Sequence, residues 1–288
     1  MALGWGVCDQ NWANQYDIVS RADYSCSQWT RDITTVRQVV GESYTGYRDG
    51  VLDFNEYHGE CDPMVYNNAD SEPYTIIGNH YGNRVCLGAV GATFFSYDKA
   101  AQIGRMVGTS MGAAEDFARI SGIMQSPLYD KFKVVDKTYG PSTGLTVDKL
   151  VQARSLLGVN CVPMSTRVTV LAGSDAIPAL FADKVLSSDY SPGYGLLTAK
   201  FPMVMNMQLR FGPITGRSSI PKKGDDSIAI VIAKDDLIQT YNMPLRREVN
   251  KLHGRIGLDF LAEIMTGVGV ANPSGIVLIK YDAKNTKN

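Results

Sequence analysis

The sequence predicts an α+β fold, and three stretches of the chain carry that prediction. Residues 98–124 repeat apolar side chains at three- and four-residue steps, the period of one long amphipathic helix. The second half alternates short helical and strand-like segments, and its continuous apolar run Ile228–Ala233 is typical of a buried strand. Residues 1–97 are rich in Gly, Asn, Asp, Tyr and Trp and show no helical period, so we expect them to be irregular or β.

Length and composition indicate a folded protein with a large core. The chain has 288 residues, of which 44% are hydrophobic and 20% charged, and these values exclude a disordered or low-complexity protein. Five cysteines without a C-x-x-C pair predict reduced thiols rather than a disulfide framework or a zinc knuckle. The longest uncharged stretch, 264–279, has sixteen residues, whereas a membrane-spanning helix needs about 20. No basic residue precedes Arg21, so we expect no secretory signal.

The formal net charge of −1 conceals two oppositely charged regions. Residues 1–98 contain five arginines, no lysine and thirteen acidic residues, a net charge of −8, whereas residues 99–288 carry a net charge of +7. An offset of this size indicates that the two regions face different surroundings or each other. The near-zero total argues against a protein that packs nucleic acid as histones do.

Residues 1–97 contain turn signals but few strong helix formers. Asp49-Gly50 separates 42–48 from 51–57 and predicts a β-hairpin. Gly78-Asn79 and Gly82-Asn83 predict further turns before an apolar run. We therefore expect an extended arm followed by a long loop or hairpin, with little core of its own.

Residues 98–124 are expected to form a single helix. Asp98 suits its N-cap position, and Pro127 ends the segment. A stripe along one side consists of glycines at every fourth position, Gly104, Gly108 and Gly112. Charged neighbours exclude a membrane helix, and each glycine costs about 1 kcal/mol of helix propensity against alanine. The stripe therefore predicts that another backbone segment lies close across the helix.

Downstream of residue 140 the chain alternates compact elements. A helix is expected from Thr146, with Gly158 as its C-cap. A short helix should start at Ser174 or Asp175. The expected strands are Arg167–Ala172, Lys200–Phe211, Ile228–Ala233, Arg255–Met265 and Ile276–Tyr281. For Arg255–Met265 a helix is the alternative, because Asp259 and Glu263 would also suit one face of a helix.

One short motif matches an enzyme pattern. The segment 108–112 fits the G-x-S-x-G nucleophile elbow at Ser110, and Asp235 or Asp236 and His253 follow in the order of a hydrolase triad. An elbow requires a buried strand before the serine, but the residues that precede Ser110 are charged and helical in period. A serine hydrolase is therefore the weaker alternative.

Other site patterns are not found in the sequence. None of the three histidines has metal-ligand spacing to another His or Cys. No GxxxxGK[ST] motif occurs, and no GxGxxG follows a strand. The basic pairs Lys222-Lys223 and Arg246-Arg247 form no nucleic-acid motif, although a diffuse basic face can hold phosphate without reading sequence. We expect no catalytic residue, no metal and no cofactor, which favours a structural or assembly protein.

The order of elements in the second half resembles the major capsid proteins of tailed bacteriophages, the Hong Kong 97-type shell fold. The resemblance lies in the segments GLTVDKLVQARSLL, RVTVLAGSDAIPALFAD, VLSSDYSPG, KFPMVMNMQLRFG, SIAIVIAKDDLIQTYN and LDFLAEIMTGVGVANPSGIVLIK. The family's long spine helix corresponds to Asp98–Met124. Its N-terminal arm and extended loop correspond, by position, to residues 1–97.

The resemblance implies a division of the chain. The expected units are an N-terminal arm at 1–40, an extended β-hairpin loop at 41–97, a spine helix and peripheral domain at 98–139 with 234–266, and an axial domain at 140–233 with 267–288. No lysine precedes Lys99, so the loop cannot form the lysine–asparagine cross-link of some family members. No cleavable helical scaffold segment is recognised, so we expect a separate scaffolding protein or none, and no maturation cleavage.

The resemblance also implies a function, a location and partners. The chain would be a major capsid protein that self-assembles into hexamers and pentamers of an icosahedral head around double-stranded DNA. It would be assembled in the host cytoplasm and located in the virion. Its partners would be other copies of itself, DNA bound without sequence preference, and scaffolding, portal or decoration proteins, but no membrane. An encapsulin-like compartment with enzyme cargo shares the fold and is the first alternative.

Charge predicts where copies meet, because the acidic loop of one copy would face the basic body of the next. The loop candidates are Glu56, Glu60, Asp62, Asp70 and Glu72. The body candidates are Lys222, Lys223, Arg246 and Arg247. Surface ion pairs contribute about 0–1 kcal/mol each, so the strength of such an interface must come from repetition and wrapped area.

Overall fold

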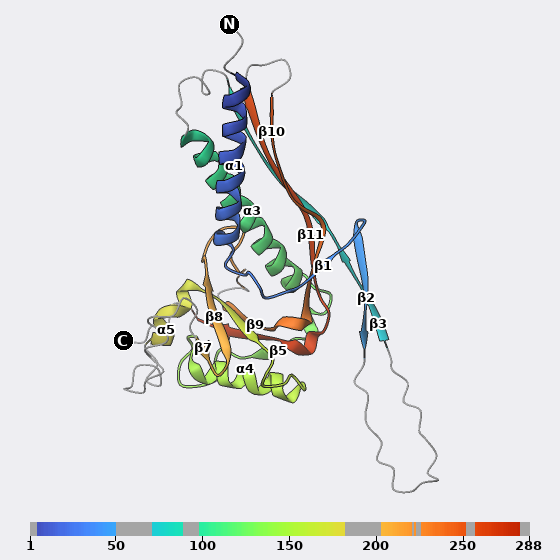
Figure 1. The fold of residues 1–288 in the computed structure, drawn as a ribbon. Coiled ribbons are helices and arrows are strands. Elements are labelled where there is room, and N and C mark those ends of the chain that lie inside the picture. Colours follow the sequence, from blue (N-terminus) through green and yellow to red (C-terminus); the bar gives the residue numbers. More distant parts are fainter. Residues whose placement is uncertain are drawn as a thin grey trace, which may run out of the picture.

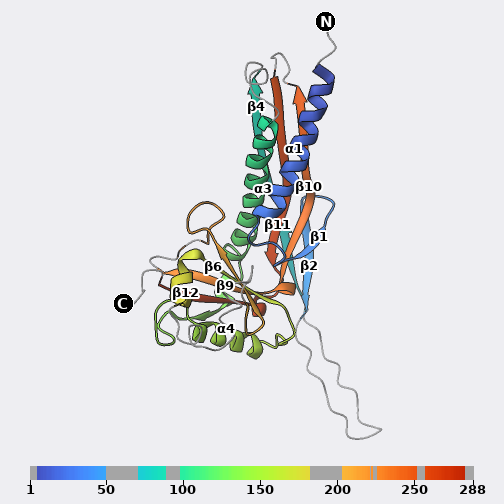
Figure 2. The same ribbon diagram turned by 60° about the vertical axis from the view of Figure 1, so that its left-hand side comes forward.

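The computed structural model describes residues 5–49, 71–88, 98–181, 203–220, 222, 226–251 and 257–282. These residues form a long part and a compact part, and a two-stranded ribbon lies beside the long part (Figure 1). Two helices run along one face of the long part's sheet (Figure 2). The compact part surrounds a second sheet at one end of the long part.

The long part consists of two helices and four strands. The helices are α1 (Trp5–Ser27) and α3 (Asp98–Met124). In sheet order, the strands are β1 (Thr35–Gln38), β10 (Leu237–Lys251), β11 (Gly257–Val270) and β4 (Asn79–Gly88). β1 is parallel to β10, and the other two pairs are antiparallel. The strand predicted at 255–265 is confirmed for 257–265, which belong to the longer strand β11, and residues 255–256 lie outside the described residues.

Helix α1 is an element that the sequence prediction missed. We expected residues 1–97 to lack helices, and this expectation is wrong for Trp5–Ser27. Trp12, Tyr16 and Ser20 lie four residues apart and are 9%, 1% and 1% exposed. The buried side of the helix is narrow, and polar residues flank these positions in the sequence. The sequence therefore shows no apolar period that would predict a helix. Packing against α3, rather than helix propensity, stabilises α1.

Helix α3 has the predicted bounds, and its glycine stripe has the expected role. A Cβ added at Gly108 would lie 2.6 Å from the main-chain oxygen of Ser20, and one at Gly104 would lie 3.1 Å from that of Tyr16. At Gly112 an added Cβ would overlap the hydroxyl of Ser27. The backbone of α1 therefore rests directly on the stripe.

The strand before Asp49-Gly50 has a partner that the sequence does not predict. β2 (Ser43–Asp49) pairs with β3 (Ser71–Ile77) to form the ribbon. The predicted partner, 51–57, lies outside the described residues, so the hairpin at Asp49-Gly50 stays a prediction. The turn predicted at Gly82-Asn83 is wrong, because both residues lie inside β4. Dipeptide turn signals are local, and side-chain packing between strands determines the pairing.

The compact part contains two helices and a six-stranded sheet. The helices are α4 (Val147–Val159) and α5 (Ile177–Phe181). In sheet order, the strands are β5 (Lys133–Val135), β12 (Ile276–Tyr281), β9 (Ser227–Ala233), β6 (Val168–Gly173), β8 (Met207–Gly212) and β7 (Met203–Val204). The predictions of both helices and of β6, β9 and β12 are confirmed. Helix α4 continues through Gly158, and its C-cap is Asn160.

Both faces of the compact sheet are buried. All seven residues of β9 are buried. Ile228, Ile230 and Ile232 belong to a core that includes the C-terminal end of α3, whereas Ala229 and Val231 belong to a core that includes α4 and α5. Because side chains alternate along a strand, this one strand supplies both cores.

The predicted strand Lys200–Phe211 is instead a hairpin, as far as the structure describes it. β7 ends at Val204, and Met205 and Asn206 have positive φ angles of 48° and 62°. Two successive residues of this kind form the tight turn that joins antiparallel strands, and β8 begins at Met207. The turn contains no glycine, so the alternating methionines concealed it in the sequence. Residues 200–202 lie outside the described residues.

Candidate functional site

The β2–β3 ribbon presents one face to solvent. Its register pairs Ser43 with Ile77, Thr45 with Thr75, and Tyr47 with Pro73, and all six of these residues are exposed. Tyr47 and Ile77 are 68% and 67% exposed. These six residues are uncharged, and half of them are β-branched. This uncharged face is therefore a candidate interaction surface.

The other face of the ribbon is anchored to the body. Ile76 is buried, and a Cβ added at Gly269 would lie 2.6 Å from its side chain. A Cβ added at Gly267 would lie 2.5 Å from the main-chain oxygen of Ile77. Arg48 Nε donates a hydrogen bond to the main-chain oxygen of Ala271. The glycines of β11 thus allow the base of the ribbon to rest directly on the long sheet.

A groove of about 590 Å³ lies between the ribbon and the body. Its walls include Tyr74 and Ile76 from β3, Ser121 and Gly122 from α3, and Val268 from β11. The Tyr44 and Tyr74 rings lie 6.4 Å apart across the ribbon and keep the two strands in register.

Most of the predicted acidic contact residues lie outside the described residues. These are Glu56, Glu60, Asp62 and Asp70, and the same holds for Lys223. Glu72 is described and exposed, and its Oε2 lies 3.1 Å from Nη1 of Arg48. Lys222 is also exposed. The structure therefore leaves Glu72 and Lys222 accessible to another molecule.

The predicted basic pair Arg246-Arg247 already has partners within the chain. Arg247 Nε lies 3.3 Å from Oδ1 of Asp17, and the side chain of Arg247 is 12% exposed. Burial lowers the pKa of Arg247. Arg246 forms ion pairs with Glu248 and Glu263, and the hydrogen bond to Glu248 raises its pKa. Both cations are therefore partly neutralised before any second copy approaches.

The outer face of the long sheet carries polar contacts across its strands, one of which is the Arg84–Asp259 ion pair. Arg84 Nε lies 2.7 Å from Oδ2 of Asp259, and His80 Nε2 lies 3.3 Å from Oε2 of Glu263. The Arg84 hydrogen bond lowers the pKa of Asp259. Sequence analysis could not find these pairs, because only the β4–β11 register brings residues 175 or more positions apart into contact.

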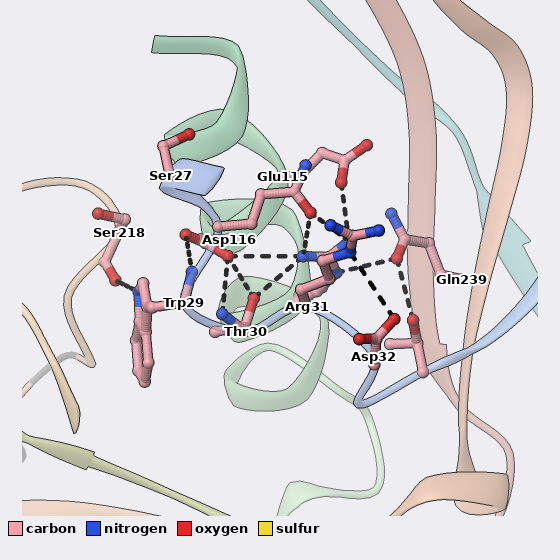
Figure 3. Close-up of polar contacts among 12 residues, drawn as sticks. Ser27, Trp29, Thr30, Arg31, Asp32, Glu115, Asp116, Ser218 and Gln239 are labelled. Carbon is pink, nitrogen blue, oxygen red and sulfur yellow. Dashed lines mark hydrogen bonds and ion pairs between the residues drawn. The ribbon is translucent and has the colours of Figure 1, made fainter. Parts of the chain in front are cut away.

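A buried polar cluster joins α1, α3 and β10 where the long part meets the compact part (Figure 3). Glu115, Asp116 and Arg119 of α3 are at most 3% exposed. Arg119 Nη2 lies 2.7 Å from Oε2 of Glu115, and Arg119 Nε donates to Oε1 of Gln239 at 2.9 Å. Two carboxylates and one guanidinium are thus removed from water together, so each depends on the others.

Neutral side chains complete this cluster. The Thr34 hydroxyl donates a hydrogen bond to Gln239 Oε1 at 3.0 Å, and Gln239 Nε2 donates to Thr266 Oγ1 at 3.1 Å. The Tyr241 hydroxyl donates to Glu115 Oε1 at 2.9 Å. Burial, together with this carboxylate, raises the pKa of Tyr241 to about 12. The tyrosine therefore stays protonated and keeps its hydrogen bond throughout the ordinary pH range.

The sequence contained one signal for this cluster that we did not use. Three charged residues fall within five positions of a helix whose other side is apolar, which favours a buried polar cluster as well as excluding a membrane helix. A cavity of about 630 Å³ adjoins the cluster and is lined by Tyr24, Gln28 and Arg31, among others. Nothing in this arrangement supplies a nucleophile paired with a base.

Ser110 does not occupy a nucleophile elbow. It lies in the middle of α3, and its Oγ accepts a hydrogen bond of 3.0 Å from Asn83 Nδ2. The elbow requires a strand-to-helix turn at the serine, so the hydrolase alternative is wrong in its geometry. His253, the expected base, lies outside the described residues.

The described residues contain neither a metal-binding cluster nor a membrane-spanning helix. In these ranges no three His, Cys, Asp or Glu side chains are grouped as a metal ion requires. Within the same ranges, no helix combines the length and the apolar character that crossing a membrane demands.

Comparison with known proteins identifies the fold. The chain is similar to the head protein of Helicobacter pylori bacteriophage KHP40, with a TM-score of 0.67, 10% identity, and coverage of 90% of this chain and 91% of that one. It is similar to the capsid protein of cyanophage P-SCSP1u, with a TM-score of 0.65, 16% identity, and coverage of 87% and 86%.

A protein shell of another kind shows the same likeness. The SrpI encapsulin of Synechococcus elongatus PCC 7942 gives a TM-score of 0.61 at 12% identity, with coverage of 90% of this chain and 89% of that one. No protein-family model and no curated protein matches the sequence. The described arrangement of a long helix, a long sheet with a ribbon and a compact mixed sheet is therefore the Hong Kong 97-type shell fold.

Proposed function

We propose that the chain is the major capsid protein of a tailed bacteriophage. Copies would assemble into hexamers and pentamers of an icosahedral head that encloses double-stranded DNA. The observation that carries this proposal is the likeness to phage head proteins over about nine-tenths of both chains. Encapsulins show the same likeness. The proposal therefore has two parts: that the chain forms a shell, and that this shell encloses DNA and not an enzyme cargo.

The ribbon supports self-assembly. A two-stranded ribbon is at best marginally stable in water by itself, and this one exposes Tyr47 and Ile77 on an uncharged face. A neighbouring copy that covers this face would stabilise the ribbon and bury its apolar area. Of the arm proposed at 1–40 and the loop proposed at 41–97, α1 packs on α3 and β4 pairs with β11 inside the subunit. The part proposed to reach the neighbour is therefore the ribbon of β2 and β3.

Charge would guide the same contact. The loop residues Glu56, Glu60, Asp62, Asp70 and Glu72 of one copy would approach the basic body of the next. On that body Lys222 and Lys223 are the better candidates, because Arg246 and Arg247 already have partners. Complementary charge increases the association rate and fixes register more than it adds affinity. Scaffolding, portal and decoration proteins would be further partners.

Electron microscopy of the expressed chain, with and without a scaffolding protein, tests the shell function. We expect closed icosahedral particles, and a chain that remains monomeric under all conditions would overturn the proposal. Nuclease-protected DNA in particles purified from phage-producing cells would support a capsid. A protein cargo without DNA would support the encapsulin-like compartment instead.

A further inference from the structure

We propose that residues 29–31, here called the strap, set the angle between the long part and the compact part and thereby the curvature of the shell. The strap follows α1 in the sequence and passes between the two parts. The effect on shell curvature rests on the proposed shell function, whereas the position of the strap between the two parts rests only on the contacts that the structure describes.

The long part holds the strap through one carboxylate. The main-chain N–H groups of Trp29 and Thr30 donate to the two oxygens of Asp116, at 3.2 and 3.1 Å. Arg119 Nη1 lies 3.2 Å from Oγ1 of Thr30. Thr30 and Asp116 are 0% and 1% exposed, so no water competes for these bonds and the strap cannot shift along α3 without breaking them.

The compact part holds two residues of the strap, Trp29 and Arg31, from the other side. Trp29 Nε1 donates to the main-chain oxygen of Ser218 at 3.1 Å (Figure 3). A Cβ added at Gly212 of β8 would lie 2.5 Å from Cε2 of the Trp29 ring. Arg210 of β8 donates from Nη1 to the main-chain oxygens of Trp29, at 3.4 Å, and of Arg31.

The covalent connections between the two parts are short segments. The chain passes from α3 to β5 through the 3-10 turn Tyr129–Lys131, from β9 to β10 through Lys234–Asp236, and from β11 to β12 through Pro273–Gly275. Segments of a few residues at element ends are where hinge motion is usually absorbed. The two parts also share a hydrophobic core, in which Ile120 and Ile123 of α3 lie with Ile230 of β9. The strap adds buried hydrogen bonds and a ring contact beside this core, and releasing them should let the two parts rotate about it.

Curvature depends on this angle because hexamers and pentamers place one chain in different surroundings. If the two parts rotate against each other, the neighbours attached to each part rotate with them. A subunit with a released strap should therefore assemble into particles of altered or broader size. The strap is a positioning device and touches no ligand.

Gly212→Val is the variant that should release the strap, because the added side chain occupies the position of the Trp29 ring. Gly158→Ala is the matched control, since a Cβ at Gly158, also in the compact part, meets nothing within 4 Å. Hydrogen exchange at the Trp29 and Thr30 amides reports release. We expect exchange on the order of tenfold faster in Gly212→Val and unchanged exchange in the control.

The angle can be measured with two native thiols. Cys26 in the long part and Cys161 in the compact part are free and exposed, so they can carry spin labels after Cys8, Cys61 and Cys86 are replaced by serine. In Gly212→Val we expect a shifted or broader distance distribution between the labels, together with altered particle diameters. If Gly212→Val does not fold, Trp29→Phe removes the hydrogen bond to Ser218 and takes its place.

Two results would overturn the inference. One is faster exchange of the strap amides with an unchanged label distance and unchanged particle diameters. The other is unchanged exchange in the variants, which would contradict the contacts themselves. If the wild-type chain forms no particles, the proposed function fails, but the label distance in the unassembled subunit still decides whether the strap sets the angle.

Discussion

The two sheets of the molecule differ in what covers them. The compact sheet has cores on both faces, and every residue of β9 is buried. The long sheet has helices on one face, while its other face carries ion pairs such as Arg84–Asp259. The compact part therefore completes its cores within one chain. The long part and its ribbon leave exposed surface, and the buried charges of the long part lie where it meets the compact part.

The largest expected effect concerns those buried charges. Arg119→Met would remove the cation between Glu115 and Asp116 and leave two buried carboxylates uncompensated. We expect the free energy of unfolding to fall by about 3–5 kcal/mol, as measured by urea denaturation of the unassembled subunit. A decrease in the free energy of unfolding of less than about 1 kcal/mol would contradict this prediction, because the buried cluster would then contribute no more than a surface ion pair of the long sheet.

The next effect concerns the contact between α1 and α3. Gly108→Ala would force apart two backbones that meet at this position, and we expect a loss of about 1–3 kcal/mol from overpacking. Gly158→Ala in α4 is the matched control. A Cβ at position 158 meets no neighbouring atom, so this substitution should raise the free energy of unfolding by about 0.5–1 kcal/mol through helix propensity. Thermal unfolding of both variants measures the difference, and a gain in both would show that α1 is not packed as described.

A smaller effect depends on pH. Burial raises the pKa of Asp236, between β9 and β10, to about 6. The folded state thus binds this proton more tightly than the unfolded state, so the stability contributed by this group falls as pH rises from about 4 to about 6. Asp236→Asn should stabilise the chain by about 1 kcal/mol at pH 8, after allowance for partial exposure.

The same substitution should have little effect at about pH 3, where the carboxyl is protonated in both the folded and the unfolded state. Asp235→Asn, at the exposed neighbouring residue, is the control. Equal stabilisation by Asp236→Asn at both pH values would contradict this account, because it would show that the buried charge is not the cause.

The smallest effect belongs to the outer face of the long sheet. Arg84→Gln would break the ion pair with Asp259, and the expected loss is about 0–1 kcal/mol at low salt and less at high salt. Comparing denaturation midpoints at two ionic strengths checks this. A decrease in the free energy of unfolding as large as that of Arg119→Met would contradict the distinction between the exposed ion pairs of the long sheet and the buried charged cluster.

Sequence alone predicted the parts of the fold that have a strong period. The apolar stripe of α3 gave its bounds, and the continuous run of β9 and the closing strand β12 were also correct. Helix α1 was not predicted because its described buried residues lie only at every fourth position, which gives no apolar stripe. The partner of β2 and the turn at Met205-Asn206 were missed because long-range packing determines them.

The buried cluster and the strap were beyond sequence reasoning for a related reason. Asp116 and Thr30 are 86 positions apart, and Trp29 and Ser218 are 189 apart. No local pattern relates residues at such separations. The charge offset between the two regions of the chain was visible in the sequence, but the structure shows that Arg246 and Arg247 are already paired within the subunit.

The most direct test of this account is a cryo-electron microscopy map of the assembled chain at side-chain resolution. The account predicts a closed shell in which Tyr47 and Ile77, on the outer face of the ribbon, are buried against a neighbouring copy. A closed shell in which this face remains exposed to solvent, or a chain that forms no shell, would contradict it.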